Sequence, residues 1–142
     1  MMRVLHITTW YPNRQEPHEA PFIARHIAAL APYATNTVWH IAVRGGKPWS
    51  FDRKSTKADR TYVLDTPINR YLILEWIATA LVLWAWYTRP RGMRFDIMNF
   101  HIAYPNCTRN KLLRRAMGLP MVITEHWSAY NRKFSATGAG VD

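Results

Sequence analysis

Residues 3–8, Arg-Val-Leu-His-Ile-Thr, form a short apolar run that is partly β-branched and starts almost at the first residue. Such a run is typical of a buried β-strand. A polar loop with prolines follows over residues 10–21, and apolar side chains then recur at helical spacing over residues 22–30. Pro21 fits the first turn of that helix. The opening of the chain therefore predicts a strand, a loop and a helix.

The same alternation continues along the chain. Further strands are predicted at residues 36–43, 61–65, 95–100 and 121–124, and further helices at residues 69–87 and 104–117. Gly118 fits a helix end, with Pro120 directly after it. Residues 49–60 are polar and basic, which indicates a surface loop. Strands that alternate with helices in this way predict an α/β fold with a doubly wound, mainly parallel sheet.

The composition is that of one globular domain. The chain has 142 residues, of which 49% are hydrophobic and 20% charged. Its single cysteine, Cys107, cannot form an intrachain disulfide, and the short apolar run at the N-terminus does not predict a signal peptide. We therefore expect a cytoplasmic protein. The net charge of +10 favours anionic partners such as nucleic acid, anionic lipid or phosphorylated small molecules.

Polar side chains follow two of the predicted strands directly. Glu125, His126 and Ser128 come after the strand at residues 121–124, and His101 comes after the strand at residues 95–100. In doubly wound sheets, ligands bind at the carboxyl ends of the strands. A histidine there can bond a sugar hydroxyl or transfer a proton near neutral pH. The alternative is a structural histidine that bonds only the backbone.

Two other segments near the same sheet edge carry candidate residues. Tyr104 and Asn106 follow His101, and Asn106 can serve either as a helix cap or as a ligand contact. The loop at residues 10–21 contains Asn13 and His18 and leads into a helix N-terminus, where anions bind. It has no G-x-G-x-x-G or P-loop pattern, so a solvated loop is the alternative.

The apolar segment at residues 71–87 has two interpretations. It is 17 residues long and contains Glu75, whereas a membrane span needs about 20 mostly apolar residues. A helix that covers the sheet is therefore predicted. Its tryptophans and the nearby Arg89, Arg91 and Arg94 also suit shallow contact with an anionic membrane surface.

Other kinds of site find little support. Six histidines and one cysteine are scattered without the spacing of metal ligands, so no metal site is predicted. No G-x-S-x-G motif indicates a serine hydrolase. The basic residues are spread along the chain without a recognition motif, which argues against nucleic acid as the partner.

Two pairs of segments resemble a known family. Residues 2–12 with 21–30, and residues 95–105 with 118–128, resemble the N-terminal domain of family-4 retaining glycosyltransferases of the GT-B type. The resemblance implies a Rossmann-like three-layer sheet that forms one half of a GT-B architecture. It also implies that this domain binds a glycan or lipid-linked acceptor, while a second domain binds most of the nucleotide-sugar donor.

The resemblance also implies the chemistry and the site. A hexosyl group is transferred with retention of configuration, with the nucleotide-sugar as co-substrate and with no other cofactor and no catalytic metal. His126 matches the family's histidine that lines the cleft near the reacting sugar, and His101 matches its histidine before the next helix. The first loop lacks the glycines with which the family approaches the donor phosphates.

The resemblance covers one domain, which we place at residues 1–134, with a flexible tail at residues 135–142. The donor-binding domain with its E-x7-E carboxylates is absent, so we expect a truncated enzyme that is inactive alone. The full enzyme is expected to act in polysaccharide or lipid-linked glycan assembly, as a peripheral protein on the inner face of the membrane. The alternative is a non-catalytic module that binds anionic membrane lipid or a glycan.

Overall fold

Six strands and three helices make up the part of the chain that the computed structural model describes, residues 1–56 and 59–126. The strands are β1 (Met2–Thr8), β2 (Ala34–Gly45), β3 (Ser50–Ser55), β4 (Arg60–Thr66), β5 (Ile97–His101) and β6 (Met121–Thr124). The helices are α1 (Pro21–Ala29), α2 (Tyr71–Tyr87) and α3 (Asn110–Met117). The predicted tail and Ser128 lie outside the described residues.

The strands form one sheet in the order β3-β4-β2-β1-β5-β6. Every neighbouring pair is parallel except β3 and β4, which are antiparallel. The chain starts in the middle at β1, moves to β2, forms the edge strand β3 and then β4 between β3 and β2, and returns to the other side of β1 as β5. This is a doubly wound, Rossmann-like α/β sheet, as predicted, and its strand order reverses between β1 and β5.

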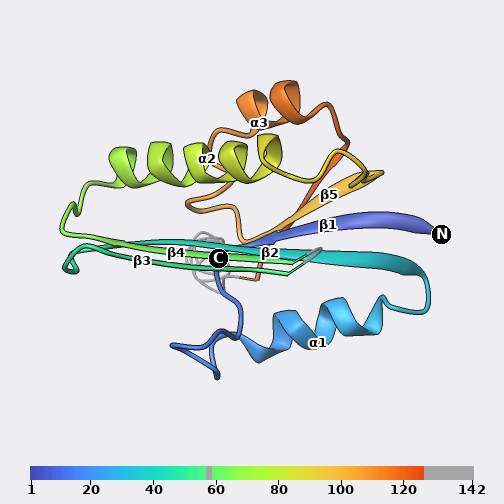
Figure 1. Cartoon of the computed structure of the whole chain (residues 1–142), viewed down its shortest axis with the longest axis horizontal. Coiled ribbons are helices and arrows are strands. Elements are labelled where there is room, and N and C mark those ends of the chain that lie inside the picture. The colour runs from blue at the N-terminus through green and yellow to red at the C-terminus, as the bar shows by residue number, and fades with distance from the viewer. Residues whose placement is uncertain (57–58, 127–142) are drawn as a thin grey trace, which may run out of the picture.

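The helices cover both faces of the sheet, with α2 and α3 on one side and α1 on the other (Figure 1). The main apolar core lies between the sheet and α2 and α3. Trp39 of β2 is fully buried there, with its ring centroid 6.5 Å from Trp86 and 5.9 Å from Phe95. None of the helices in the described part of the chain is long and apolar enough to cross a bilayer.

The face toward α1 has a much smaller apolar cluster, formed by Ile23, Ile27 and Ile102. Val38 of β2 packs against this cluster, and His6 of β1 lies beside Val38 in the sheet register. Side chains alternate between the two faces of a strand. His6 therefore points toward α1, while its neighbours in β1 point toward α2 and α3.

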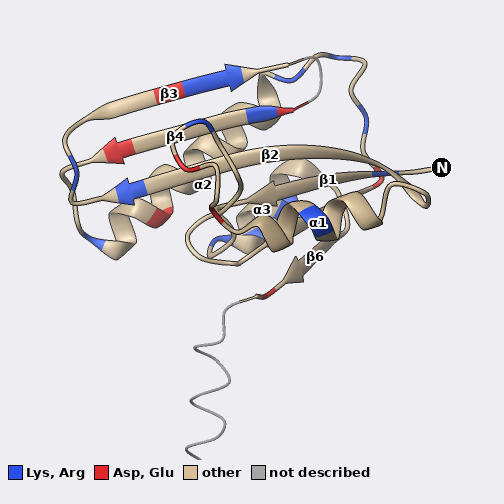
Figure 2. Cartoon of the chain, turned by 90° about the horizontal axis from the view of Figure 1, so that it is seen from below, with Lys and Arg blue, Asp and Glu red and all other residues tan. Residues whose placement is uncertain are grey.

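The prediction of a loop at residues 49–60 was wrong, because Ser50–Ser55 forms the edge strand β3. Phe51 and Arg53 of this strand point toward α2, where they lie 6.5 Å and 5.3 Å from the ring of Trp84. Most of the other side chains are exposed and polar. Both β3 and β4 carry acidic as well as basic residues (Figure 2). Charged, exposed side chains are common on edge strands, and they hide the alternation that marks buried strands.

The helix predicted to begin at residue 104 begins at Asn110 instead. Pro105 disfavours helical backbone at the residue before it, Tyr104. The Asn106 side chain is buried and donates to the carbonyl oxygen of Ile41 at 2.7 Å, so it ties this segment to β2 and does not cap a helix. At the other end Gly118 has φ 66 and caps α3, as predicted.

Candidate functional site

The candidate site lies where β1, β5 and β6 end together. Thr8 of β1 pairs in register with His101 of β5, and His101 pairs with Thr124 of β6. The three carboxyl ends are therefore level with one another, and Glu125 and His126 follow directly. This edge contains the reversal of strand order, where doubly wound sheets bind ligands.

Three histidines, from β1, β5 and the segment just after β6, contact one another in series at this edge. His101 Nδ1 lies 3.2 Å from His126 Nε2, and His101 Nε2 lies 3.0 Å from His6 Nδ1. His6 Nε2 in turn lies 3.0 Å from Asn36 Oδ1 on β2. We call Asn36, His6, His101 and His126 the histidine series. It runs from inside the α1 face of the sheet to the end of β6.

Burial is greatest in the middle of the histidine series, and Asn36 at its β2 end is half-buried. His6 and His101 are each 0% exposed, and His126 is partly exposed. Burial lowers the pKa of His101 to about 3, assisted by the neighbouring histidines. Burial also lowers the pKa values of His6 and His126. The imidazoles are therefore neutral near pH 7, and each has one donor and one acceptor nitrogen.

Helix α1 covers one side of this cluster. The ring of Phe22 meets His126 edge-on at 5.3 Å between centroids, and His26 does so at 5.8 Å. His26 also contacts His101, at 6.4 Å. The partly exposed His126 is thus held between the end of β6 and the first turns of α1.

Glu125 and Tyr104 connect the loops around the cluster. A Glu125 carboxylate oxygen accepts from the backbone N–H of Ala103 at 3.3 Å, which joins the end of β6 to the segment after β5. The carbonyl oxygen of Tyr104 accepts from the Thr9 hydroxyl at 3.3 Å. The Tyr104 hydroxyl is buried without a hydrogen-bond partner among the described residues, and burial raises its pKa.

Asn13 and His18 lie outside the histidine series. Asn13 accepts from the backbone N–H groups of Gln15 and Glu16, so it shapes its own loop, and it lines a separate cavity of about 70 Å³. His18 is exposed and does not line that cavity. The structure thus brings His101 and His126 together, with Glu125 next to them, and separates Asn13 and His18 from them.

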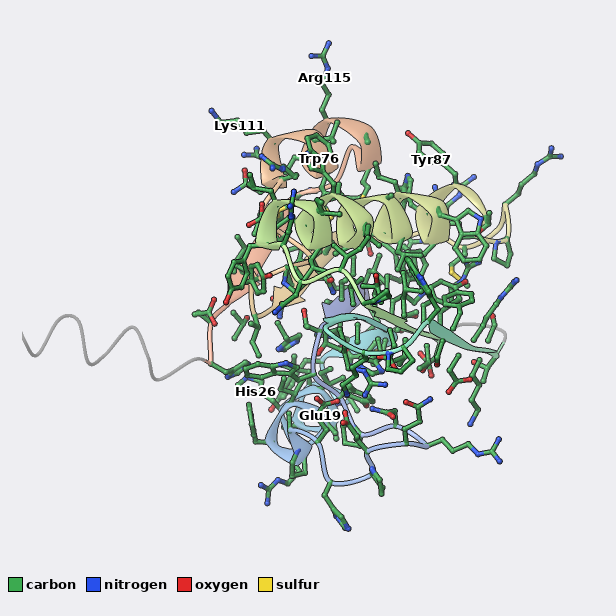
Figure 3. The ribbon with its side chains drawn as sticks, turned by 90° about the vertical axis from the view of Figure 1, so that its left-hand side faces the viewer. Glu19, His26, Trp76, Tyr87, Lys111 and Arg115 are labelled. Carbon is green, nitrogen blue, oxygen red and sulfur yellow. The ribbon has the colours of Figure 1, made fainter. Side chains whose placement is uncertain are left out.

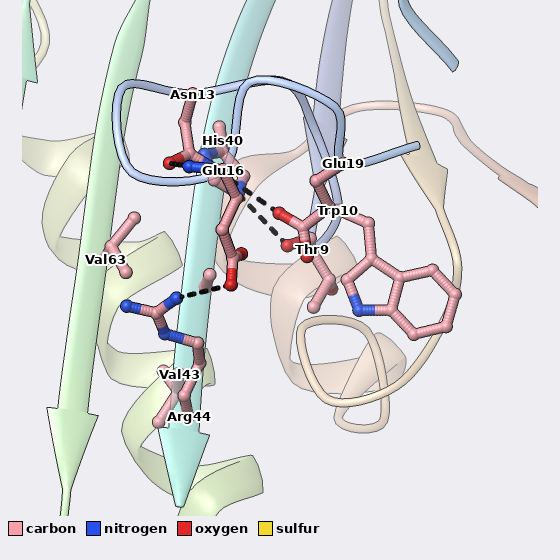
Figure 4. Close-up of a pocket in the computed structure, with 10 residues that line it drawn as sticks. Thr9, Trp10, Asn13, Glu16, Glu19, His40, Val43, Arg44 and Val63 are labelled. Carbon is pink, nitrogen blue, oxygen red and sulfur yellow. Dashed lines mark hydrogen bonds and ion pairs between the residues drawn. The ribbon is translucent and has the colours of Figure 1, made fainter. Parts of the chain in front are cut away.

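The separate cavity lies over the ends of β1 and β2 (Figure 4). Glu16 pairs with Arg44 at 3.2 Å, and Arg44 also holds Asp65 at 2.6 Å. Burial and the neighbouring Glu16 raise the pKa of Glu19 to about 7. His40 donates from Nε2 to the carbonyl oxygen of Thr9. The ionic pairs here are satisfied within the protein.

A scan of protein-family models matched nothing, and no curated protein matched the chain. Within residues 1–56 and 59–126, no three His, Cys, Asp or Glu side chains are grouped to hold a metal ion. The chemistry available at the edge is that of neutral imidazoles and a nearby carboxylate, which can bond and orient hydroxyl groups.

Sequence reasoning missed His6 and Asn36. His6 stands inside an apolar strand, where the pattern predicts only a buried run. One signal was available, because His6 lies two residues before Thr8 and so shares its face of the strand. The partners on β2 and β5 follow only from the strand order.

Proposed function

We propose that this chain is the acceptor-binding half of a retaining glycosyltransferase of the GT-B type. It would transfer a hexosyl group from a nucleotide-sugar to a glycan or lipid-linked acceptor at the inner face of the membrane. The observation that supports this most is the contact between His101 and His126 beside the reversal of strand order. His126 is the residue to which we assign contact with the reacting sugar.

The geometry favours a ligand rich in hydroxyl groups. His126 is partly exposed and neutral, and the Phe22 ring beside it offers an apolar surface. Glu125 lies on the exposed side of the same edge. A neutral imidazole can orient a hydroxyl without adding a charge to the site, and a sugar presents both hydroxyls and apolar ring faces. Acceptor binding at one wall of a two-domain cleft agrees with this arrangement.

The test is sugar transfer by the protein that joins this domain to a donor-binding domain, assayed with a panel of UDP- and GDP-hexoses. His126→Ala is expected to lower kcat/KM by about 100-fold or more, the usual size for a side chain that acts on the reacting groups. Lys54→Ala is the control, since Lys54 is exposed on the remote edge strand β3. Equal turnover by the His126 variant and the parent protein would remove His126 from the reaction.

A second candidate function, binding to an anionic membrane, is favoured by the outer face of α2 and α3. Trp76, Tyr87, Lys111 and Arg115 all point away from the sheet on this side (Figure 3). Trp76 is 53% exposed and Tyr87 68% exposed. Aromatic side chains at such a face suit the interfacial region of a bilayer, and cations beside them attract anionic lipid.

Sedimentation with vesicles tests this second candidate. We expect binding to phosphatidylglycerol vesicles at low salt and little binding to phosphatidylcholine vesicles. Trp76→Ser with Tyr87→Ser should weaken this binding. Tyr33→Ser is the matched control, because Tyr33 is 77% exposed and lies between α1 and β2, outside α2 and α3. Equal loss in the control would exclude a specific α2–α3 membrane face.

A further inference from the structure

Asn36 fixes the direction of hydrogen bonding at the β2 end of the histidine series. Its Nδ2 lies 3.4 Å from the carbonyl oxygens of both Ile27 and Ala34, so its Oδ1 faces His6 Nε2 at 3.0 Å. An amide oxygen accepts hydrogen bonds and does not donate them. His6 must therefore carry its hydrogen on Nε2.

This assignment passes from ring to ring. A neutral imidazole with its hydrogen on Nε2 has a lone pair on Nδ1. His6 Nδ1 therefore accepts from His101 Nε2 at 3.0 Å. By the same logic, His101 Nδ1 accepts from His126 Nε2 at 3.2 Å. One amide on β2 thus determines which nitrogen of His126 is protonated.

The ring geometry agrees with directed N–H···N bonds. The ring planes of His101 and His126 are parallel to within 2°, and the ring centroids are 5.5 Å apart. That separation is what two imidazoles need when they meet edge to edge in line. The rings of His6 and His101 are 5.2 Å apart and inclined by 34°. Each donor hydrogen therefore points toward the neighbouring lone pair.

Asn99 is the other amide beside the histidine series, and it can accommodate this assignment. In the structure its Nδ2 lies 3.4 Å from His101 Nε2, and its Oδ1 accepts from the Thr124 hydroxyl at 2.9 Å. A half-turn of the amide places its oxygen toward His101 and its nitrogen toward Thr124, whose hydroxyl can accept. The hydrogen on His101 Nε2 then has acceptors on both sides.

Within residues 1–56 and 59–126, two titratable groups outside the histidine series act on His126. His26 faces it from α1, and Glu125 precedes it on the chain. Burial lowers the pKa values of the three histidines of the series, so the series stays neutral near pH 7. Neutrality matters because a doubly protonated ring donates from both nitrogens and has no lone pair to accept from its neighbour. The fixed direction of hydrogen bonding along the series would then be lost.

We infer that Asn36, His6 and His101 are positioning residues that hold His126 as the Nε2–H tautomer, so that His126 Nδ1 offers a lone pair to the ligand. The ligand group that meets it is a hydrogen-bond donor, which excludes a phosphate or carbonyl oxygen at this nitrogen. That this donor is a hydroxyl of the sugar or of its acceptor rests on the proposed function.

Nitrogen NMR of the 142-residue chain with labelled imidazoles tests the inference directly. Near pH 7 we expect Nε2–H signals for His6, His101 and His126, with couplings across the two N–H···N bonds. His18 is exposed and serves as a comparison whose two tautomers should average. An Nδ1–H signal for His126, or the absence of both couplings, overturns the inference.

Substitution of Asn36 then tests its role at a distance. Asn36→Leu removes the acceptor, so we expect the Nε2–H fraction of His126 to fall although two rings separate them. Asn99→Leu is the matched control, because Asn99 is similarly half-buried and also contacts His101. Equal changes in both variants overturn the role of Asn36. If Asn36→Leu does not fold, the tautomers of the parent chain still decide the inference.

The two proposals fail separately. Loss of the predicted tautomer removes the inference and leaves the glycosyltransferase proposal in place. Unchanged sugar transfer in His126→Ala removes that proposal, while the NMR result still stands as a property of the fold.

Discussion

The same strands build two different surfaces in this molecule. On β1, Leu5 and Ile7 point into the core beneath α2 and α3, while His6 between them points toward α1. On β5, Phe100 belongs to that core, and the next residue, His101, joins the histidine series. All five side chains are fully buried, so the two faces differ in polarity and not in exposure.

The difference shows how one sheet can serve stability and function at once. Apolar burial has no preferred direction and stabilises through area. A buried polar group costs free energy unless it is hydrogen-bonded, but its bonds fix its orientation. The apolar face of the sheet, which packs against α2 and α3, therefore supplies most of the stability. The α1 face has a small apolar cluster and gives up some stability for fixed imidazoles at the sheet edge.

The largest expected effect is on the apolar face. Trp39→Ala removes a fully buried ring between Trp86 and Phe95 and should lower the free energy of unfolding by about 3–5 kcal/mol. Urea unfolding followed by circular dichroism measures this. A loss below about 1 kcal/mol, the level of a surface change, would contradict the assignment of the main core to this face.

A smaller and different effect is expected on the polar face. His101→Leu leaves the buried His6 Nδ1 without its partner and should cost about 1–3 kcal/mol. The double variant His6→Leu with His101→Leu removes both partners. It should therefore cost less than the sum of the two single variants. Additive losses in the urea double-mutant cycle would mean that the two rings act independently.

Acid should lower the free energy of unfolding, because the fold holds buried histidines in the neutral form. Burial lowers the pKa of His40 to about 4, whereas a histidine in an unfolded chain titrates near pH 6.5. Between these values the unfolded chain binds more protons. The stability that neutral His40 contributes is therefore fully present above about pH 6.5 and is lost as the pH falls toward 4.

His40→Gln keeps a donor for the Thr9 carbonyl and removes this titration. Between about pH 6 and pH 5, the parent should lose up to about 1.4 kcal/mol more stability per pH unit than the variant. Glu19 has a pKa raised to about 7 and acts in the opposite direction, but it does so in both proteins. Parallel curves of unfolding free energy against pH would show that His40 is not held neutral.

The sequence predicted the parts of the fold that depend on apolar pattern. The parallel strands and the three helices follow from runs and spacings that burial imposes. The edge strand at Ser50–Ser55 was not predicted. It buries few side chains, so its sequence lacks the apolar pattern that burial imposes on other strands. The early start predicted for α3 failed because Asn106 bonds to β2, a contact that no local pattern reveals.

Only those site residues that directly follow a predicted strand could be predicted from the sequence. His101 and His126 could be named because polar residues follow apolar runs there. His6 could not, because its role depends on the pairing of β1 with β5, and Asn36 depends on the pairing of β1 with β2. Strand order arises from packing of the whole chain, and single strands do not record it.

The smallest expected effect compares one backbone position on each side of the sheet. Gly118 ends α3 at φ 66, and Ala20 precedes α1 at φ 42, in the left-handed region that favours glycine. A methyl group added at Gly118 meets no atom within 4 Å, so Gly118→Ala should cost about 1 kcal/mol through backbone strain alone. Ala20→Gly relieves the same kind of strain and should raise stability by up to about 1 kcal/mol.

Thermal unfolding of the two variants should therefore shift in opposite directions from the parent. The pair also separates local strain from packing, because neither change creates a cavity in the main core. A loss of stability in Ala20→Gly would mean that contacts of its methyl group with the Ile23 and Ile27 cluster outweigh the strain. The α1 side would then be packed more tightly than its few apolar side chains suggest. The two faces of the sheet would then differ less in how much apolar packing contributes to stability.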